Sequence, residues 1–169
     1  IAWDAPGYGG SGDPGDDWLM ADYATALAGL LDELGLDRVA MLGQSWGGVL
    51  AQTFVGRYPE RVQGLVLSDT SMGGRSQPDE QRLASLNARL AALETMTPAQ
   101  LAPARAPAIV GPNPSAEILR EAETMMAQIR PNGYRRAAIA LAEADTRSAH
   151  AGIAVPTLIL AGEHDGIVP

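Results

Sequence analysis

Short apolar runs bounded by turn residues recur along this chain and predict buried strands. The complete runs are "RVAMLG" (38–43), "VQGLVLSD" (62–69) and the run at 155–161, which begins "VPTLIL". A further run at Ile1–Asp4 has the composition of the end of a strand and is followed by a glycine-rich loop.

Helical periodicity fills the segments between these runs. Apolar residues recur at helical spacing from Leu19 to Leu34, where Gly35 provides a stop. A second helix is predicted at 45–59, directly before the strand at 62–69. Strands and helices that alternate in this order predict right-handed crossovers and a mostly parallel sheet covered by helices, which is an α/β fold.

The pattern changes after Asp69. Residues 70–150 contain no strand-like run, but they have helical stretches around 78–96, 115–130 and 134–144. The segment "PAQLAPARAPAIVGPNP" is too rich in proline for one long helix and is expected to link short ones. We therefore predict a core formed by residues 1–70 and 151–169, interrupted by a helical cap insertion at 71–150.

Composition narrows the class of partner. The net charge of −8 argues against nucleic acid or an anionic membrane as the main partner. No run of about 18 apolar residues is present, and the N-terminus lacks a signal peptide, so we expect no membrane span and a cytoplasmic location. The chain has no cysteine, which excludes disulfides and thiolate metal sites.

Both ends of the chain look cut. It begins without Met inside a strand-like run and stops at "GIVP" with no closing element, so we expect a core truncated at both ends. A sheet that lacks its outer strands exposes apolar edges, and the chain alone is expected to associate or aggregate. The oligomeric state of the whole protein is not predicted.

The opening segment contains Gly7-x-Gly9-x-x-Gly12, the spelling of a dinucleotide-binding fingerprint. Such a fingerprint needs its third glycine at the start of a helix whose N-terminus holds the pyrophosphate. Here "DPGDD" follows Gly12, and its three carboxylates would repel a phosphate. The sequence therefore argues against NAD or FAD binding by this loop.

A stronger motif lies between the strand at 38–43 and the helix that follows it. Gly43-Gln44-Ser45-Trp46-Gly47 has the Gly-x-Ser-x-Gly form of a nucleophile elbow. A sharp, strained turn lifts the Ser45 hydroxyl clear of the sheet, and small residues two before and two after it let strand and helix approach. The amide of Trp46 then points at the oxyanion that forms when Ser45 attacks a carbonyl.

The motifs together resemble the α/β-hydrolase family over essentially the whole chain. "WDAPGYGGSGDP" is similar to that family's strand-end loop, "GQSWGG" to its elbow, and "RYPERVQGLVLSD" to the helix end and strand that follow. "VPTLILAGEHDGIVP" resembles the strand that carries the acid of the catalytic triad. On this resemblance Ser45 is the nucleophile, Asp165 the acid, and Asp69, at the end of the preceding strand, the alternative acid.

The resemblance leaves the general base unassigned. In the family the histidine follows the acid beyond one further strand, but this chain ends four residues after Asp165. His164 is adjacent to the acid and His150 precedes the strand, so neither matches. The chain alone is therefore expected to be inactive or nearly so, because serine without a base is a poor nucleophile.

The sequence thus predicts a serine hydrolase that acts on an ester, lactone or related carbonyl of a small molecule through an acyl-enzyme at Ser45. The motifs resemble those of esterases, enol-lactonases and proline iminopeptidases, and the resemblance implies no metal or organic cofactor. The alternatives are a non-catalytic binding protein of the same fold and an inactive fragment that lacks the catalytic histidine.

Overall fold

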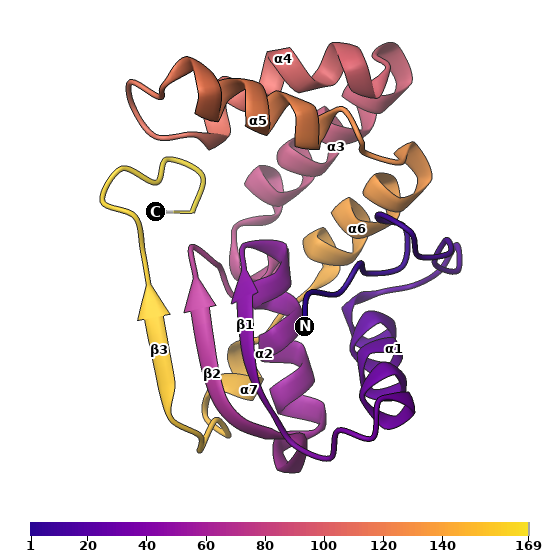
Figure 1. The fold of residues 1–169 in the computed structure, drawn as a ribbon, viewed down its shortest axis with the longest axis vertical. Helices are drawn as coiled ribbons and strands as arrows, with labels where there is room; N and C mark the ends of the chain where they lie inside the picture. The colour runs from indigo at the N-terminus through magenta and orange to yellow at the C-terminus, as the bar shows by residue number, and fades with distance from the viewer. Residues whose placement is uncertain (169) are drawn as a thin grey trace.

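The computed structural model describes residues 1–168 (Figure 1). Pro169, the last residue of the segment predicted at 151–169, lies outside the described residues. The elements of the core are α1 (Met20–Glu33), β1 (Val39–Gln44), α2 (Trp46–Arg57), η1 (Pro59–Arg61), β2 (Val62–Ser68), α7 (Arg147–His150) and β3 (Thr157–Leu160). Between β2 and α7 the chain forms η2 (Gly74–Ser76), α3 (Asp79–Thr95), α4 (Pro98–Ile109), α5 (Ala116–Met126) and α6 (Pro131–Glu143).

The strands form one parallel sheet in the order β1-β2-β3. Met41 lies opposite Leu65, and Leu67 lies opposite both Gly43 of β1 and Ile159 of β3. Each connection between neighbouring strands passes through helices, as parallel strands require. The prediction of an α/β fold with a mostly parallel sheet is confirmed.

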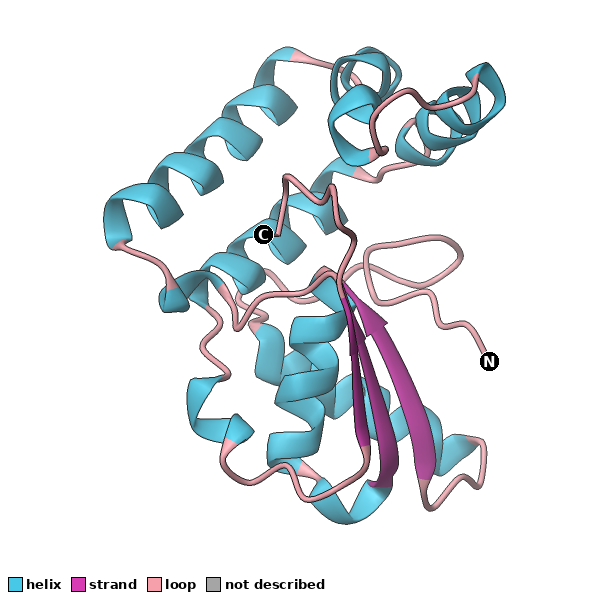
Figure 2. Cartoon of the chain, turned by 90° about the vertical axis from the view of Figure 1, so that its left-hand side faces the viewer, coloured by secondary structure: helices cyan, strands magenta, loops and turns pink. Residues whose placement is uncertain are grey.

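The helices of the core lie on one side of this sheet (Figure 2). Phe54 and Val49 of α2 pack with Leu65 and Val62 of β2 and with Tyr23 of α1, and the side chains of all these residues are fully buried. Their burial removes apolar surface from water and is the main driving force for this half of the fold.

The prediction that the strands are buried is wrong for much of β1 and for β3. All residues of β3 are exposed, Ile159 to 72%, and Leu42 of β1 is 70% exposed. The reason for β1 is that helices cover only one face of the sheet, so its alternate side chains point away from the core. The strand β3 is at the edge of the sheet, and its side chains are exposed on both faces.

Residues Ile1–Asp4 do not form the strand that their composition predicts. Ile1 is 96% exposed, and β1 pairs only with β2 within residues 1–168, so this segment has no strand beside it to complete a ladder. A groove of about 1040 Å³ lies between it and Val39–Leu42 of β1. An apolar run becomes a strand only where a neighbour accepts its hydrogen bonds.

The helices α3 to α6 form a layer beyond the carboxyl ends of the strands (Figure 1). The expectation that the proline-rich segment links short helices is wrong for residues Pro98–Ile109, which form a single helix, whereas residues 110–114 do connect α4 to α5. Thr97 and Gln100 form a capping box at its start, and Leu101, Ala102 and Ala106 are buried. Burial of this face and packing against α5 outweigh the backbone hydrogen bonds that Pro103 and Pro107 remove.

The helical layer is joined to the core at α6. The indole Nε1 of Trp46 donates a hydrogen bond to the carbonyl of Ala137 at 3.0 Å. Arg130 donates to the carbonyl of Ser11 and forms an ion pair with Asp13. A Cβ placed on Gly133 would lie 2.0 Å from the carbonyl oxygen of Gly7. The glycine-rich loop is therefore a packing surface for α6.

Tyr23 is a buried aromatic whose hydroxyl has no hydrogen-bond partner within residues 1–168. Its ring makes edge-to-face contacts with Trp18 and Trp46, at centroid distances of 5.3 and 4.9 Å. Tyr23→Phe keeps these contacts and removes the unpaired hydroxyl. We expect the free energy of unfolding at pH 7 to stay the same or rise by up to about 1 kcal/mol in urea titrations.

The same substitution should change the response to alkali. Burial raises the pKa of Tyr23 to about 12, although Arg136 acts in the opposite direction. The unfolded chain loses this proton near pH ~10, so the stabilisation is full below that pH and is lost as the pH rises through about 12. Tyr23→Phe should lose less stability than the parent over this range. A parent-like alkaline loss together with a lower stability at pH 7 would contradict both expectations.

Candidate active site

Ser45 lies on the turn between β1 and α2 and has φ 49° and ψ −116°. This left-handed conformation costs a residue other than glycine of order 1–3 kcal/mol and persists only where its surroundings hold it. The Ser45 amide donates to the carbonyl of Ser68 at 3.0 Å. The Ser45 carbonyl accepts from the amide of Gly48 at 3.0 Å and from the Thr70 hydroxyl at 2.7 Å.

Glycines allow strand and helix to approach at this turn. A Cβ on Gly43 would lie 2.3 Å from the carbonyl oxygen of Gly47, and one on Gly48 would lie 2.4 Å from Thr70 Oγ1. A Cβ on Gly47 would meet no atom within 4 Å. The expected need for a small residue two positions before Ser45 is therefore met, but on the helix side the close approach is at Gly48.

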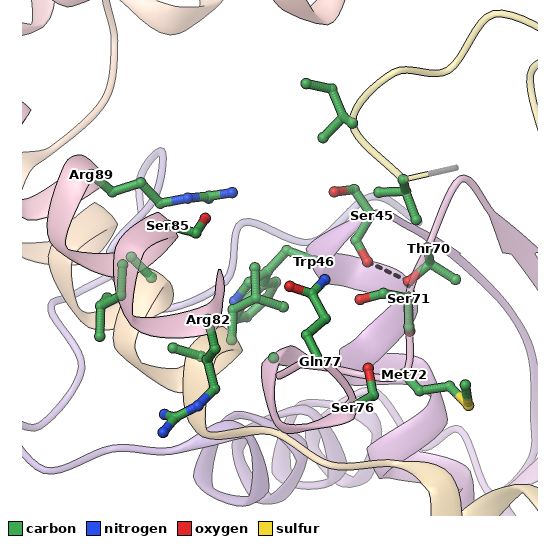
Figure 3. A pocket seen from close by; sticks show the side chains of 17 residues that line it. Ser45, Trp46, Thr70, Ser71, Met72, Ser76, Gln77, Arg82, Ser85 and Arg89 are labelled. Atoms are coloured by element: carbon green, nitrogen blue, oxygen red, sulfur yellow. Dashed lines mark hydrogen bonds between the residues drawn. The ribbon is translucent and has the colours of Figure 1, made fainter. Parts of the chain in front are cut away.

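A pocket of about 480 Å³ opens beside Ser45, within the size range of small-molecule sites (Figure 3). The core contributes Ser45 and Trp46, the helical layer contributes residues of α3 and α6, and Ile167 and Val168 close one side. The segment after β2 supplies the polar part of the wall, which includes Thr70, Ser71, Ser76 and Gln77. Figure 3 shows the Ser45 hydroxyl pointing into this space.

Trp46 is the first residue of α2, so its backbone amide is one of the helix N-terminal amides without an intrahelical acceptor. Its indole is held by the hydrogen bond to Ala137 and the contact with Tyr23. The side chain is thus fixed between core and helical layer, and the amide stays available for a ligand at the pocket floor.

The two candidate acids both lie beside Gly162, a residue of the loop after β3: Asp69 directly follows β2, and Asp165 belongs to that loop. Asp69 Oδ1 accepts from the Gly162 amide at 2.7 Å and Asp69 Oδ2 from the Ser68 hydroxyl at 2.8 Å. These hydrogen bonds lower the pKa of Asp69, and the one from Ser68 has the larger effect. Asp165 Oδ1 accepts from the amides of Ile167 and Val168 at 2.8 and 3.1 Å.

The structure does not bring a histidine to Ser45. His150, at the end of α7, has its Nε2 2.6 Å from Gln52 Oε1 on α2, and His164 is exposed. Within residues 1–168 no histidine nitrogen is hydrogen-bonded to Ser45 or to either candidate acid. The arrangement therefore brings together Ser45 as candidate nucleophile, the Trp46 amide as candidate oxyanion donor and two carboxylates, and within residues 1–168 it places no histidine beside them.

Sequence reasoning missed the part of the pocket wall that α3 provides. Arg82, Ser85 and Arg89 line the pocket and are spaced at intervals of three and four residues, so they share one face of α3. That spacing was visible in the sequence. The spacing does not show that this face of α3 lines the pocket beside Ser45.

The described part of the chain contains neither a cluster of metal-binding side chains nor a helix that could span a membrane. Residues 1–168 contain no group of three or more His, Asp or Glu side chains placed to hold a metal ion. No helix within the same residues is long and apolar enough to cross a membrane.

Comparison with known proteins gives consistent matches along the whole chain. A family model described as the alpha/beta hydrolase fold matches residues 1–169. The 3-oxoadipate enol-lactonase 2 of Acinetobacter baylyi is 30% identical over 171 residues, covering 99% of this chain and 61% of that protein. A poly(3-hydroxyalkanoate) depolymerase of Ectopseudomonas oleovorans is 41% identical over 83 residues, which is 49% of this chain and 29% of that protein.

Solved structures of hydrolases also superpose on nearly the whole chain. A hydrolase from Pseudomonas aeruginosa PA01 superposes with a TM-score of 0.84 at 26% identity, covering 97% of this chain and 61% of that one. A thermophilic esterase from Thermogutta terrifontis gives 0.82 at 27% identity, with 98% and 61% covered. The chain thus spans about three fifths of the length of these proteins.

Proposed function

Because the chain belongs to the alpha/beta hydrolase fold family, we propose that the protein containing it is a serine hydrolase of small-molecule esters or lactones, with Ser45 as nucleophile. The observation that carries this proposal is the Ser45 turn. Ser45 has a positive φ at the N-terminus of α2, and its hydroxyl faces the pocket (Figure 3). A strained turn that exposes a hydroxyl at a helix N-terminus suits attack on a carbonyl.

The proposed reaction begins with a bond between Ser45 Oγ and the substrate carbonyl carbon. A histidine in a part of the protein outside residues 1–169 takes the hydroxyl proton as this bond forms. It then gives the proton to the alcohol oxygen as the bond between that oxygen and the carbonyl carbon breaks. The Trp46 amide donates a hydrogen bond to the oxyanion, and preorganised donors of this kind contribute most where charge develops. Water then cleaves the acyl-enzyme, releasing the acid and restoring Ser45.

We assign Asp165 as the carboxylate that orients the histidine. Both oxygens of Asp69 accept hydrogen bonds, from Ser68 and Gly162. Asp165 uses only Oδ1 for its turn, and within residues 1–168 its Oδ2 accepts no hydrogen bond. Asp165 therefore has an oxygen available for an imidazole N–H, and Asp69 remains the alternative.

A serine-directed fluorophosphonate probe tests the nucleophile. We expect the full-length protein to be labelled at neutral pH and Ser45→Ala to be unlabelled. Ser76→Ala is the matched control, because it removes another serine of the same pocket wall and should leave labelling intact. Labelling that persists in Ser45→Ala would refute the assignment. A full-length protein that takes no label would favour the alternative of a binding protein with this fold.

A further inference from the structure

The wall of the Ser45 pocket has an unusual charge for this chain. The sequence carries 20 acidic residues against 12 Lys and Arg, yet among residues 1–168 no Asp or Glu lines the pocket. The charged groups on the wall are Arg82 and Arg89, both from α3. A local excess of positive charge in an acidic protein attracts an anion.

Arg82 does not provide the excess positive charge, because carboxylates that pair with it neutralise its guanidinium. It pairs with Asp79 at 3.0 Å and with Glu143 of α6 at 2.6 Å, and its side chain is only 8% exposed. Glu143 also pairs with Arg75 of η2, so two guanidinium groups and two carboxylates form a network without net charge that links α3, α6 and η2.

Arg89 differs from Arg82 in each of these respects. It is half-buried, and within residues 1–168 no carboxylate lies within ion-pair distance and no acceptor takes a hydrogen bond from its guanidinium. Tyr8 lies within electrostatic reach, but burial raises the pKa of Tyr8, so its phenol stays neutral and supplies no counter-charge. Figure 3 shows the Arg89 side chain extending across the pocket from the side opposite Ser45.

We infer that this pocket selects substrates that carry a carboxylate in addition to the carbonyl attacked by Ser45, and that Arg89 binds this carboxylate. The inference rests on the proposed function and names its substrate class. A guanidinium matches a carboxylate with two parallel hydrogen bonds, and binding removes the cost of leaving a half-buried charge unpaired. Ser85, one turn before Arg89 on α3, lines the same wall and offers a further hydroxyl donor.

Two matched pairs of esters test this selectivity in the full-length protein. The 4-nitrophenyl half-ester of glutaric acid and 4-nitrophenyl valerate differ only by a carboxylate at the end of the acyl chain. The esters 4-carboxyphenyl valerate and phenyl valerate place the same difference on the leaving group. We expect the ratio of kcat/KM between the anionic and the neutral ester to fall by about tenfold to a hundredfold in Arg89→Met, for at least one pair.

Arg89→Lys keeps the positive charge but cannot form the two parallel hydrogen bonds of a guanidinium. It should therefore give a ratio of kcat/KM values between those of the unsubstituted protein and Arg89→Met. Arg120→Met is the matched control, because Arg120 is an exposed arginine of α5 outside the pocket wall and its loss changes the net charge equally. Ratios that stay at the parent value in Arg89→Met for both pairs, while the fluorophosphonate still labels Ser45, would overturn the inference and leave the proposed function standing.

Binding without turnover separates the two proposals further. Calorimetric titration of glutarate into the Ser45→Ala protein should show binding that Arg89→Met weakens about tenfold or more and that Arg120→Met does not change. If the parent protein takes no label, the proposed function fails, and this titration still decides the role of Arg89. Equal glutarate affinity with and without Arg89 would overturn that role.

Discussion

Replacing Asp165 by Asn in the full-length protein is expected to lower kcat for ester hydrolysis by about 10⁴-fold, the size of the loss seen when a triad acid becomes an amide. An amide cannot stabilise the imidazolium that forms when histidine takes the serine proton, and it favours the wrong tautomer. The turn itself should remain, because the Asn side-chain oxygen can still accept from the amides of Ile167 and Val168. Steady-state kinetics and a thermal melt of the same sample measure both effects.

Asp69→Asn is the matched control for this loss. Asn tolerates the positive φ of 43° at this position, and its side-chain oxygen can keep the hydrogen bond from Gly162. We expect kcat to change by less than about tenfold, because Asp69 is assigned no contact with the reacting groups. A large loss in Asp69→Asn with near-normal Asp165→Asn would transfer the acid to Asp69. Small losses in both would remove the triad from the proposed mechanism.

Gly133→Ala is expected to lower the free energy of unfolding by about 3 kcal/mol, as overpacking against fixed backbone does. The added methyl group would lie 2.0 Å from the carbonyl oxygen of Gly7, and neither atom belongs to a side chain that can turn away. Relief requires α6 to move from the glycine-rich loop, which strains the contacts of Arg130 with Ser11 and Asp13. Urea unfolding of the full-length protein measures the change.

Gly29→Ala is the matched control: it is the same substitution, and we expect it to change the free energy of unfolding in the opposite direction. Gly29 is an exposed helix residue of α1, and a Cβ there would meet no atom within 4 Å. Alanine should therefore raise the free energy of unfolding by about 0.5–1 kcal/mol through its better helix propensity. If Gly133→Ala stabilised the protein as Gly29→Ala should, the close packing of α6 on the loop would be wrong.

The strands and helices near the elbow were predictable because they follow local rules. The helix predicted at Leu19–Leu34 appears as α1 (Met20–Glu33), and the strand predicted at 62–69 appears as β2 (Val62–Ser68). Apolar periodicity and the stop at Gly35 are properties of the chain segment itself. The two wrong predictions of secondary structure, at Ile1–Asp4 and at the proline-rich α4, both concern segments whose conformation depends on a partner. The wrong prediction of buried residues in β1 and β3 likewise depends on which faces of the sheet the helices cover.

The candidate site divides in the same way. The turn at Ser45 was predictable because Gly-x-Ser-x-Gly after a strand specifies a conformation within five residues. The position of Asp165 in a loop after a strand was also readable. Three features could not be predicted from the sequence, because they join segments far apart in the chain. They are the hydrogen bonds to Asp69, the position of both acids beside Gly162, and the orientation of the α3 face that carries Arg89.

By itself, the sequence determined the α/β class, the order of strands and helices around the Ser45 turn, the strained conformation of that turn, and Gly43 as a position where strand and helix come close. These features depend on residues that are neighbours in the chain, and local sterics and periodicity decide them. Only the tertiary structure decided which carboxylate keeps an open oxygen, which arginine stays unpaired in the pocket, and which faces of the sheet are covered. Each of these depends on which distant side chains are brought together, and packing of the helices against the sheet and against each other settles that.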